Sequence, residues 1–108
     1  MWMHIAKASD DIAEHGRAVD IGGKHVALFK LGGCYYATSN VCTHQFALMT
    51  EGCVDGEYVE CPMHQGRFHI PTGKAQGSPV SEALQVYATR IEDGEVQIDF
   101  PQDVRVRS

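Results

Sequence analysis

Short runs of alternating hydrophobic and polar residues, separated by turn residues, occupy most of this chain. One run covers residues 17–21 and the next covers residues 24–30, with two glycines between them, which is the pattern of a β-hairpin. Further strand-like runs cover residues 34–38, 57–60, 83–90 and 95–100. An Asp-Gly pair joins the last two runs in a second hairpin. Repeated short strands with turns between them predict an all-β sandwich or barrel.

The rest of the pattern predicts little helical structure. No long amphipathic helix is visible, although residues 10–15 could form one short helical turn. The tail after Pro101 carries two arginines and is expected to fray. With 108 residues, of which 44% are hydrophobic, the chain is long enough to bury a core of its own. We therefore expect a single domain over residues 1–108.

Charge and the N-terminal sequence exclude several classes of partner. The formal net charge is −5, which disfavours nucleic acid because a basic surface supplies most of that affinity. An acidic surface can instead steer the protein toward a basic docking face. The first residues lack a basic start followed by an apolar run, and no stretch approaches the ~20 apolar residues of a membrane-spanning helix. We expect a cytoplasmic protein that works away from the membrane.

Two short motifs each carry one thiol and one imidazole. The first is Cys-Thr-His at residues 42–44, and the second is Cys-Pro-Met-His at residues 61–64. Together they place two thiolates and two imidazoles close in sequence. This ligand set suits a [2Fe–2S] cluster in which one iron takes both sulfurs and the other takes both nitrogens.

The residues around both motifs strengthen this interpretation. The first motif continues as Gln-Phe-Ala-Leu at residues 45–48, and the second as Gln-Gly-Arg-Phe-His at residues 65–69. From about Trp2 to Phe100 the chain resembles the Rieske family, specifically the small soluble Rieske ferredoxins that serve bacterial oxygenases of aromatic rings. The resemblance implies one Rieske [2Fe–2S] cluster, held by Cys42, His44, Cys61 and His64.

The resemblance also implies the fold and the function. The fold would be three stacked antiparallel sheets, with a small cluster-binding subdomain at about residues 40–75 inserted into a larger base. The protein would be an electron carrier of aromatic hydrocarbon catabolism rather than an enzyme. As a monomer, it would take single electrons from a flavin-dependent ferredoxin reductase and pass them to a terminal Rieske oxygenase. The alternative within the family is the small Rieske-like subunit of an assimilatory nitrite reductase or of another oxidoreductase complex.

Other uses of the same ligands fit less well. A structural zinc site can have two cysteines and two histidines, but classical zinc sites keep like ligands together, whereas here each motif mixes them. A family member that has lost its cluster, or a sensor with a labile cluster, also remains open. A sensor would call for a DNA-binding or signalling surface, which the negative charge does not favour.

The ligand set also bears on the reduction potential. Two thiolates cancel the charge of a core with both irons ferric, so the oxidised site is neutral and accepts an electron at less Coulomb cost than a four-thiolate site. Rieske centres accordingly lie at roughly −150 to +300 mV, against about −400 mV for plant-type ferredoxins. High-potential members of the family carry a loop-to-loop disulfide, a Ser and a Tyr, where this chain has Ala47 and Met63, Gly66, and Phe68. We predict a potential at the low end of the range, because hydrogen bonds to sulfur stabilise the reduced state.

Some residues near the motifs depart from the family or stay unassigned. Gln45 and Gln65 follow the histidines where family ferredoxins usually have Gly. Cys34 and Cys53 are expected to be small buried apolar residues without a disulfide between them. Among the other histidines, His69 has the best chance of touching the surroundings of the cluster.

Residues further from the ligands leave two more questions. Arg67 is expected to pair either with an acidic neighbour or with a partner protein. Residues 77–79 read Gly-Ser-Pro and resemble the family's proline loop, which covers the cluster from a third side. The alternative for residues 77–79 is a plain turn before the next strand.

Overall fold

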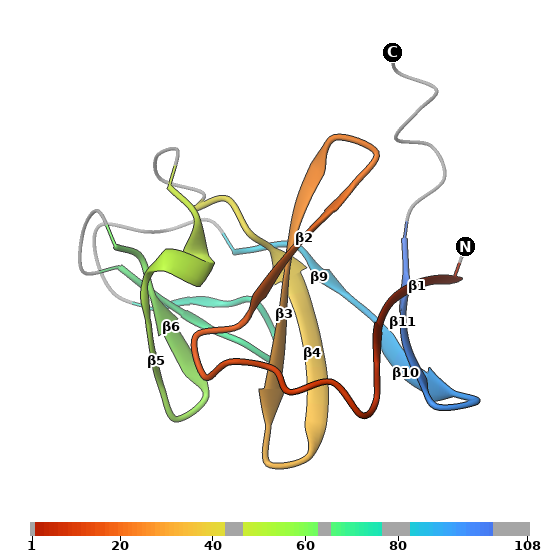
Figure 1. Ribbon diagram of the computed structural model, residues 1–108. Coiled ribbons are helices and arrows are strands. Elements are labelled where there is room, and N and C mark those ends of the chain that lie inside the picture. The colour runs from red at the N-terminus through yellow and green to blue at the C-terminus, as the bar shows by residue number, and fades with distance from the viewer. Residues whose placement is uncertain (1, 43–46, 63–65, 77–82, 101–108) are drawn as a thin grey trace.

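The computed structural model describes residues 2–42, 47–62, 66–76 and 83–100, and these residues form three antiparallel sheets (Figure 1). The strands are β1 (Trp2–Lys7), β2 (Arg17–Ile21), β3 (Lys24–Leu31), β4 (Cys34–Ser39), β5 (Cys53–Asp55), β6 (Tyr58–Glu60), β7 (Arg67–His69), β8 (Ala75–Gln76), β9 (Val86–Tyr87), β10 (Thr89–Glu92) and β11 (Glu95–Asp99). One 3₁₀ turn, η1 (Met49–Glu51), precedes β5. In this described part of the chain, no helix has the length and apolarity needed to cross a bilayer. The prediction of an all-β fold with three stacked sheets is confirmed.

The three sheets lie in layers. The terminal sheet has the strand order β1-β11-β10, the central sheet has the order β2-β3-β4-β9, and the small sheet has the order β5-β6-β7-β8. In Figure 1 the small sheet lies on the left, the terminal sheet lies on the right, and the central sheet stands between them. The terminal sheet and the small sheet therefore each pack on the central sheet through one face. The central sheet is covered on both faces.

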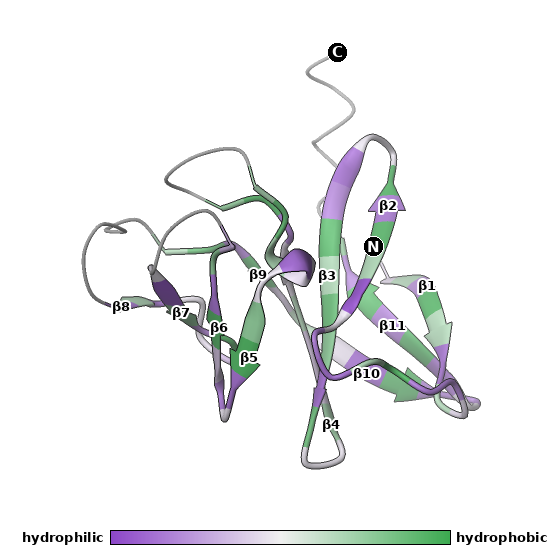
Figure 2. Ribbon diagram, turned by 60° about the vertical axis from the view of Figure 1, so that its left-hand side comes forward, coloured by the Kyte–Doolittle hydropathy of each residue, from purple (hydrophilic) through white to green (hydrophobic). Residues whose placement is uncertain are grey.

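The sequence of β3 explains why the central sheet is covered twice. Its residues Val26, Ala27, Leu28 and Phe29 are consecutive and at most 1% exposed. Because side chains alternate between the faces of a strand, Val26 and Leu28 pack with residues of the terminal sheet, whereas Ala27 and Phe29 pack with residues of the small sheet. Figure 2 shows hydrophobic residues along the middle of β3 and hydrophilic ones at its start. A continuous apolar run is typical of a strand with both faces buried.

One predicted strand is two strands. The single strand expected over residues 83–90 breaks at Ala88 into β9 and β10. The first piece pairs with β4 in the central sheet, and the second pairs with β11 in the terminal sheet. The carbonyl of Ala88 accepts a hydrogen bond from the Asp99 N–H (2.9 Å) where the chain crosses between the sheets. The alternating pattern is the same on both sides of this crossing, so it did not reveal the break.

The helical turn expected over residues 10–15 is also wrong. These residues form bends and turns, and the Asp10 carboxylate accepts hydrogen bonds from the Lys7 N–H (3.0 Å) and the Arg17 guanidinium (3.1 Å). These contacts hold the pKa of Asp10 below its usual value, with the Lys7 hydrogen bond as the main cause. A carboxylate that bonds to nearby backbone N–H groups favours a turn over a helix.

Candidate metal centre

Two short loops present the proposed thiol ligands, and backbone hydrogen bonds close both in the same way. The first loop (residues 42–47) follows β4, and the second loop (residues 61–66) connects β6 to β7. The Cys42 N–H donates to the carbonyl of Ala47, and the Cys61 N–H donates to the carbonyl of Gly66, each at 2.9 Å. Both loops thus begin with a cysteine and close five residues later.

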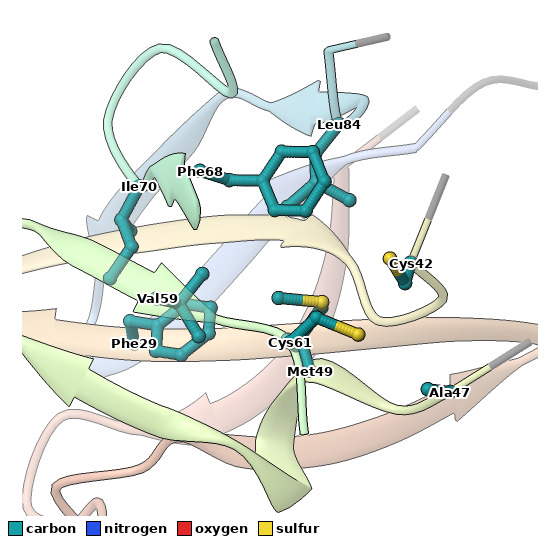
Figure 3. Close-up of a cluster of buried hydrophobic side chains, with 10 residues drawn as sticks. Phe29, Cys42, Ala47, Met49, Val59, Cys61, Phe68, Ile70 and Leu84 are labelled. Atoms are coloured by element: carbon teal, nitrogen blue, oxygen red, sulfur yellow. The ribbon is translucent and has the colours of Figure 1, made fainter. Parts of the chain in front are cut away.

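The two cysteines are buried in one hydrophobic core. Cys42 is 4% exposed and Cys61 is 2% exposed, and both belong to the core between the central and small sheets. In Figure 3 they lie with Ala47 and Met49 at one end of this core, while the larger apolar side chains fill the other end. The fold therefore brings together two thiols that are 19 positions apart in the sequence.

The proposed histidine ligands lie outside the described residues, as do Gln45, Gln65, Met63 and residues 77–79. His44 and His64 each fall, in sequence, between the two residues that close their loop. Their role as ligands stays a prediction. Among the described residues, no three His, Cys, Asp or Glu side chains converge on a point that could hold a metal ion.

A polar pair at the base of the first loop was not identified from the sequence. Asn40 is 1% exposed, and its Nδ2 donates to Thr50 Oγ1 (3.0 Å), while its Oδ1 accepts from the Thr50 N–H (2.9 Å). The Asn40 carbonyl accepts from the Met49 N–H (2.7 Å), and the Asn40 N–H donates to the carbonyl of His25 in β3 (2.9 Å). The sequence signal for this pair is limited to the position of Asn40, two residues before the first cysteine.

Gly52 connects the two loops through a close backbone approach. A Cβ atom at Gly52 would overlap the carbonyl oxygen of Glu60, the residue immediately before Cys61. The backbone of Gly52 has φ −94°, which any residue can adopt, so the lack of a side chain matters here only because of the space. The chain that leaves the first loop therefore packs directly on the chain that leads into the second.

Arg67, directly after the second loop, pairs with acidic neighbours. Its Nη2 lies 2.9 Å from Asp55 Oδ2, its Nε lies 3.9 Å from Glu60 Oε1, and its guanidinium lies 5.9 Å from the centre of the Tyr58 ring. Of the two expectations for Arg67, the acidic neighbour is the one observed. These contacts span β5, β6 and β7 on the outer face of the small sheet.

Both ring nitrogens of His69 contact side chains of the small sheet and its turns. Its Nδ1 lies 2.8 Å from Thr72 Oγ1, and its Nε2 lies 2.9 Å from Glu57 Oε1. Its ring also packs against Tyr58, with the ring centres 5.1 Å apart. These contacts tie the turn between β5 and β6 to the turn after β7, so His69 braces the small sheet.

The other two cysteines differ from the proposed ligands. Cys34 and Cys53 begin β4 and β5 and form no disulfide, but both are exposed, so the expectation that they are buried is wrong. Cys34 lies against Tyr36, and its charge when ionised is the main cause that raises the pKa of the Tyr36 phenol. Burial thus separates the four cysteines into two pairs with different environments.

The donor set and its surroundings fit a Rieske-type [2Fe–2S] cluster. Two buried thiols provide two thiolates, and neither loop contains a charged side chain. Phe68, fully buried in the same core, has no hydroxyl to offer a sulfur, and Ala47 has no thiol. The local charge would therefore come from the ligands and the cluster alone.

Comparisons with known proteins extend this assignment to most of the chain. A family model described as a Rieske [2Fe-2S] domain matches residues 1–88. The ferredoxin component of the naphthalene 1,2-dioxygenase system of Pseudomonas putida is 41% identical over 99 residues, which cover 92% of this chain and 95% of that protein.

Two solved structures have the same architecture. The Sphingomonas yanoikuyae B1 ferredoxin superposes with a TM-score of 0.86 at 34% identity, covering 92% of this chain and 98% of that one. A chain in the complex of reduced oxygenase and oxidized ferredoxin in carbazole 1,9a-dioxygenase has a TM-score of 0.83 at 35% identity, with 90% and 100% covered. The residues that the family model matches, 1–88, include both loops.

Proposed function

This chain belongs to the Rieske [2Fe–2S] ferredoxins of aromatic-ring dioxygenase systems, and from that membership we propose that it carries single electrons from a flavin-dependent reductase to a terminal Rieske oxygenase. It is an electron-transfer component of such a system and holds one [2Fe–2S] cluster. The observation that carries the proposal is the pair of buried cysteines at the start of two loops with the same closing hydrogen bond.

We assign the ligands as Cys42 and Cys61 for one iron and His44 and His64 for the other. When bound, the cluster supplies one-electron chemistry. The two thiolates supply all the negative charge of the ligand set, because the imidazoles are neutral. Burial of both cysteines excludes water from the sulfur side. Residues at about 40–75 then act as the cluster-binding subdomain of a single domain over residues 1–108.

The potential should lie at the low end of the Rieske range. Ala47 and Met63 form no bridge of cysteines, and Gly66 and Phe68 carry no hydroxyl that could donate to sulfur. Fewer hydrogen bonds to sulfur leave the reduced state less stabilised. A low potential suits a carrier between a flavin and an oxygenase and makes a poor oxidant of quinol.

The setting of this function follows from charge and family. We propose a monomer in the cytoplasm that binds a reductase and an oxygenase in turn and has no nucleic acid partner. The net charge of −5 suits basic docking faces on both proteins, and docking of this kind weakens as salt screens it.

A redox titration of the purified protein, followed by EPR, tests the proposal. We expect a rhombic Rieske signal that appears only at low potential and depends little on pH near neutrality. Electron delivery from a flavin-dependent reductase to a terminal aromatic-ring oxygenase should then require this protein. A high-potential, pH-dependent signal would contradict the argument from Ala47, Met63, Gly66 and Phe68.

Two other outcomes would point to the alternatives. A sample that contains zinc and no iron would favour a structural zinc module, once misloading during expression has been excluded. Co-purification with a large haem enzyme would favour the nitrite reductase subunit.

A further inference from the structure

We propose that Asn40 and Thr50 form a clamp that holds the first loop in the shape that binds the cluster, and that this clamp controls how long the cluster is retained. The proposal rests on the ligand assignment above. It concerns two residues that act by positioning Cys42.

The clamp joins the two ends of the first loop with buried hydrogen bonds. The Asn40 carboxamide both donates to and accepts from Thr50, at 3.0 and 2.9 Å, and Asn40 is 1% exposed. The Asn40 main chain continues the connection to Met49 (2.7 Å) and to β3 through His25 (2.9 Å). Four hydrogen bonds at one residue thus connect both ends of the loop to the central sheet.

The clamp lies where sheet pairing ends. β4 pairs with β3 only as far as Ser39, and beyond it the loop has one isolated bridge, between Val41 and Leu48, and the closing bond from Cys42 to Ala47. These two connections lie directly above the clamp. The side chains of Asn40 and Thr50 therefore reinforce the base of the loop where the strand ladder has given way to a few separate backbone hydrogen bonds.

Loss of one partner leaves the other buried and unsatisfied. If Thr50 loses its hydroxyl, the Asn40 Nδ2 loses the acceptor that it has in the structure, and Asn40 is only 1% exposed to bulk solvent. The base of the loop would then open more often. Each opening would move Cys42 from its position and leave it less able to hold the cluster against competing ligands.

The test compares variants of the holoprotein in the rate of cluster loss to an excess of an iron chelator. Thr50→Val removes the hydroxyl at constant shape, Asn40→Ala removes both side-chain bonds, and Thr50→Ser keeps the hydroxyl. The matched control is Thr38→Val, because Thr38 is 0% exposed and its hydroxyl donates only to the adjacent Ser39 carbonyl (2.9 Å). The unfolding midpoint of each variant is measured beside the rate.

We expect Thr50→Val to lose the cluster roughly tenfold faster than Thr38→Val of similar unfolding midpoint, the factor that one lost hydrogen bond implies, and Asn40→Ala to lose it at least as fast as Thr50→Val. Thr50→Ser should stay close to the wild type. Equal loss rates in Thr38→Val and Thr50→Val would overturn the clamp, because the effect would then follow general stability.

Hydrogen exchange gives a second test that does not depend on how well the variants fold. In the wild-type holoprotein, the amides of Met49 and Thr50 should exchange as slowly as those of β4, and exchange as fast as in the turn between β2 and β3 would overturn the clamp. A wild-type protein without any Rieske EPR signal would instead overturn the proposed function, and the role of the clamp with it. A normal signal with equal loss rates would overturn the clamp alone.

Discussion

The first and second loops begin and close alike, yet different parts of the fold hold them. The second loop is the connection of a hairpin, because Glu60 pairs with Arg67 and Val59 pairs with Phe68 directly below it. The first loop leaves β4 and leads into η1, so its base has a few separate backbone hydrogen bonds and one isolated bridge, with the Asn40–Thr50 side chains in addition. A strand ladder sets the geometry of one cysteine, and buried side-chain hydrogen bonds add to a sparser backbone pairing at the other.

This difference indicates how each loop can fail. A strand ladder repeats the same bond several times, so one substitution on its surface weakens it little. A side-chain clamp depends on two residues, and each has a partner that is costly to leave unsatisfied. Gly52 joins the two systems, since its backbone packs on the carbonyl of Glu60.

The largest expected effect separates the buried cysteines from the exposed ones. Cys42→Ala and Cys61→Ala should each abolish the cluster, because each removes one of the two thiolate ligands. Cys34→Ala and Cys53→Ala should retain it, because both residues are exposed at the starts of other strands. Visible absorption and iron per protein measure the outcome. A colourless Cys34→Ala or a normally loaded Cys42→Ala would show that the ligands are misassigned.

The next effect tests the contact between the loops. Gly52→Ala should lower the free energy of unfolding by about 3 kcal/mol, because the new methyl group overlaps the Glu60 carbonyl and forces the backbone to shift. It should also lower the cluster content, since the shift separates the two loops. Urea unfolding and absorption measure both quantities.

Gly56→Ala is the control for Gly52→Ala. Gly56 has φ +61° at an open turn, so this variant should lose about 1 kcal/mol from backbone strain and keep its cluster. If both variants lost equal amounts of cluster, the contact at Gly52 would have no special role.

Replacing one histidine at a time asks whether the two loops contribute equally to the charge of the site. His44→Cys or His64→Cys adds a thiolate, so any cluster that still assembles should become harder to reduce, by roughly 100 mV if one ligand accounts for part of the gap between Rieske and plant-type centres. Redox titration of each variant measures the shift. An unchanged potential in an intact cluster would contradict the assignment of that histidine.

The smallest effect distinguishes the residues that close the loops. Gly66→Ser should raise the potential if the new hydroxyl reaches sulfur, because a hydrogen bond about 1–2 kcal/mol stronger in the reduced state corresponds to roughly 40–90 mV. The corresponding change in the first loop, Ala47→Ser, should shift the potential less, since the family resemblance places no such donor there. Equal shifts would mean that the two closing positions face the sulfurs in the same way.

Much of this description could be predicted from the sequence, because it depends on local patterns. Alternation of hydrophobic and polar residues placed the strands at 17–21, 24–30 and 34–38 within a residue of those observed. The mixture of Cys and His in two closely spaced motifs identified the family and the cofactor, since ligand type and spacing are properties of the chain itself. Short strands such as β7 and β8 were missed, because they contain too few residues to show a period.

The tertiary structure decided which residues of the same type differ in role. Nothing local distinguishes the burial of Cys42 and Cys61 from the exposure of Cys34 and Cys53, because burial depends on which sheets pack together. Packing of the sheets also decided the strand break at Ala88, the ion pair of Arg67 with Asp55 and the pairing of Asn40 with Thr50. The sequence by itself determined the chemistry that the ligands can perform, and packing determined where they are held, because a contact between distant residues exists only once the layers have assembled.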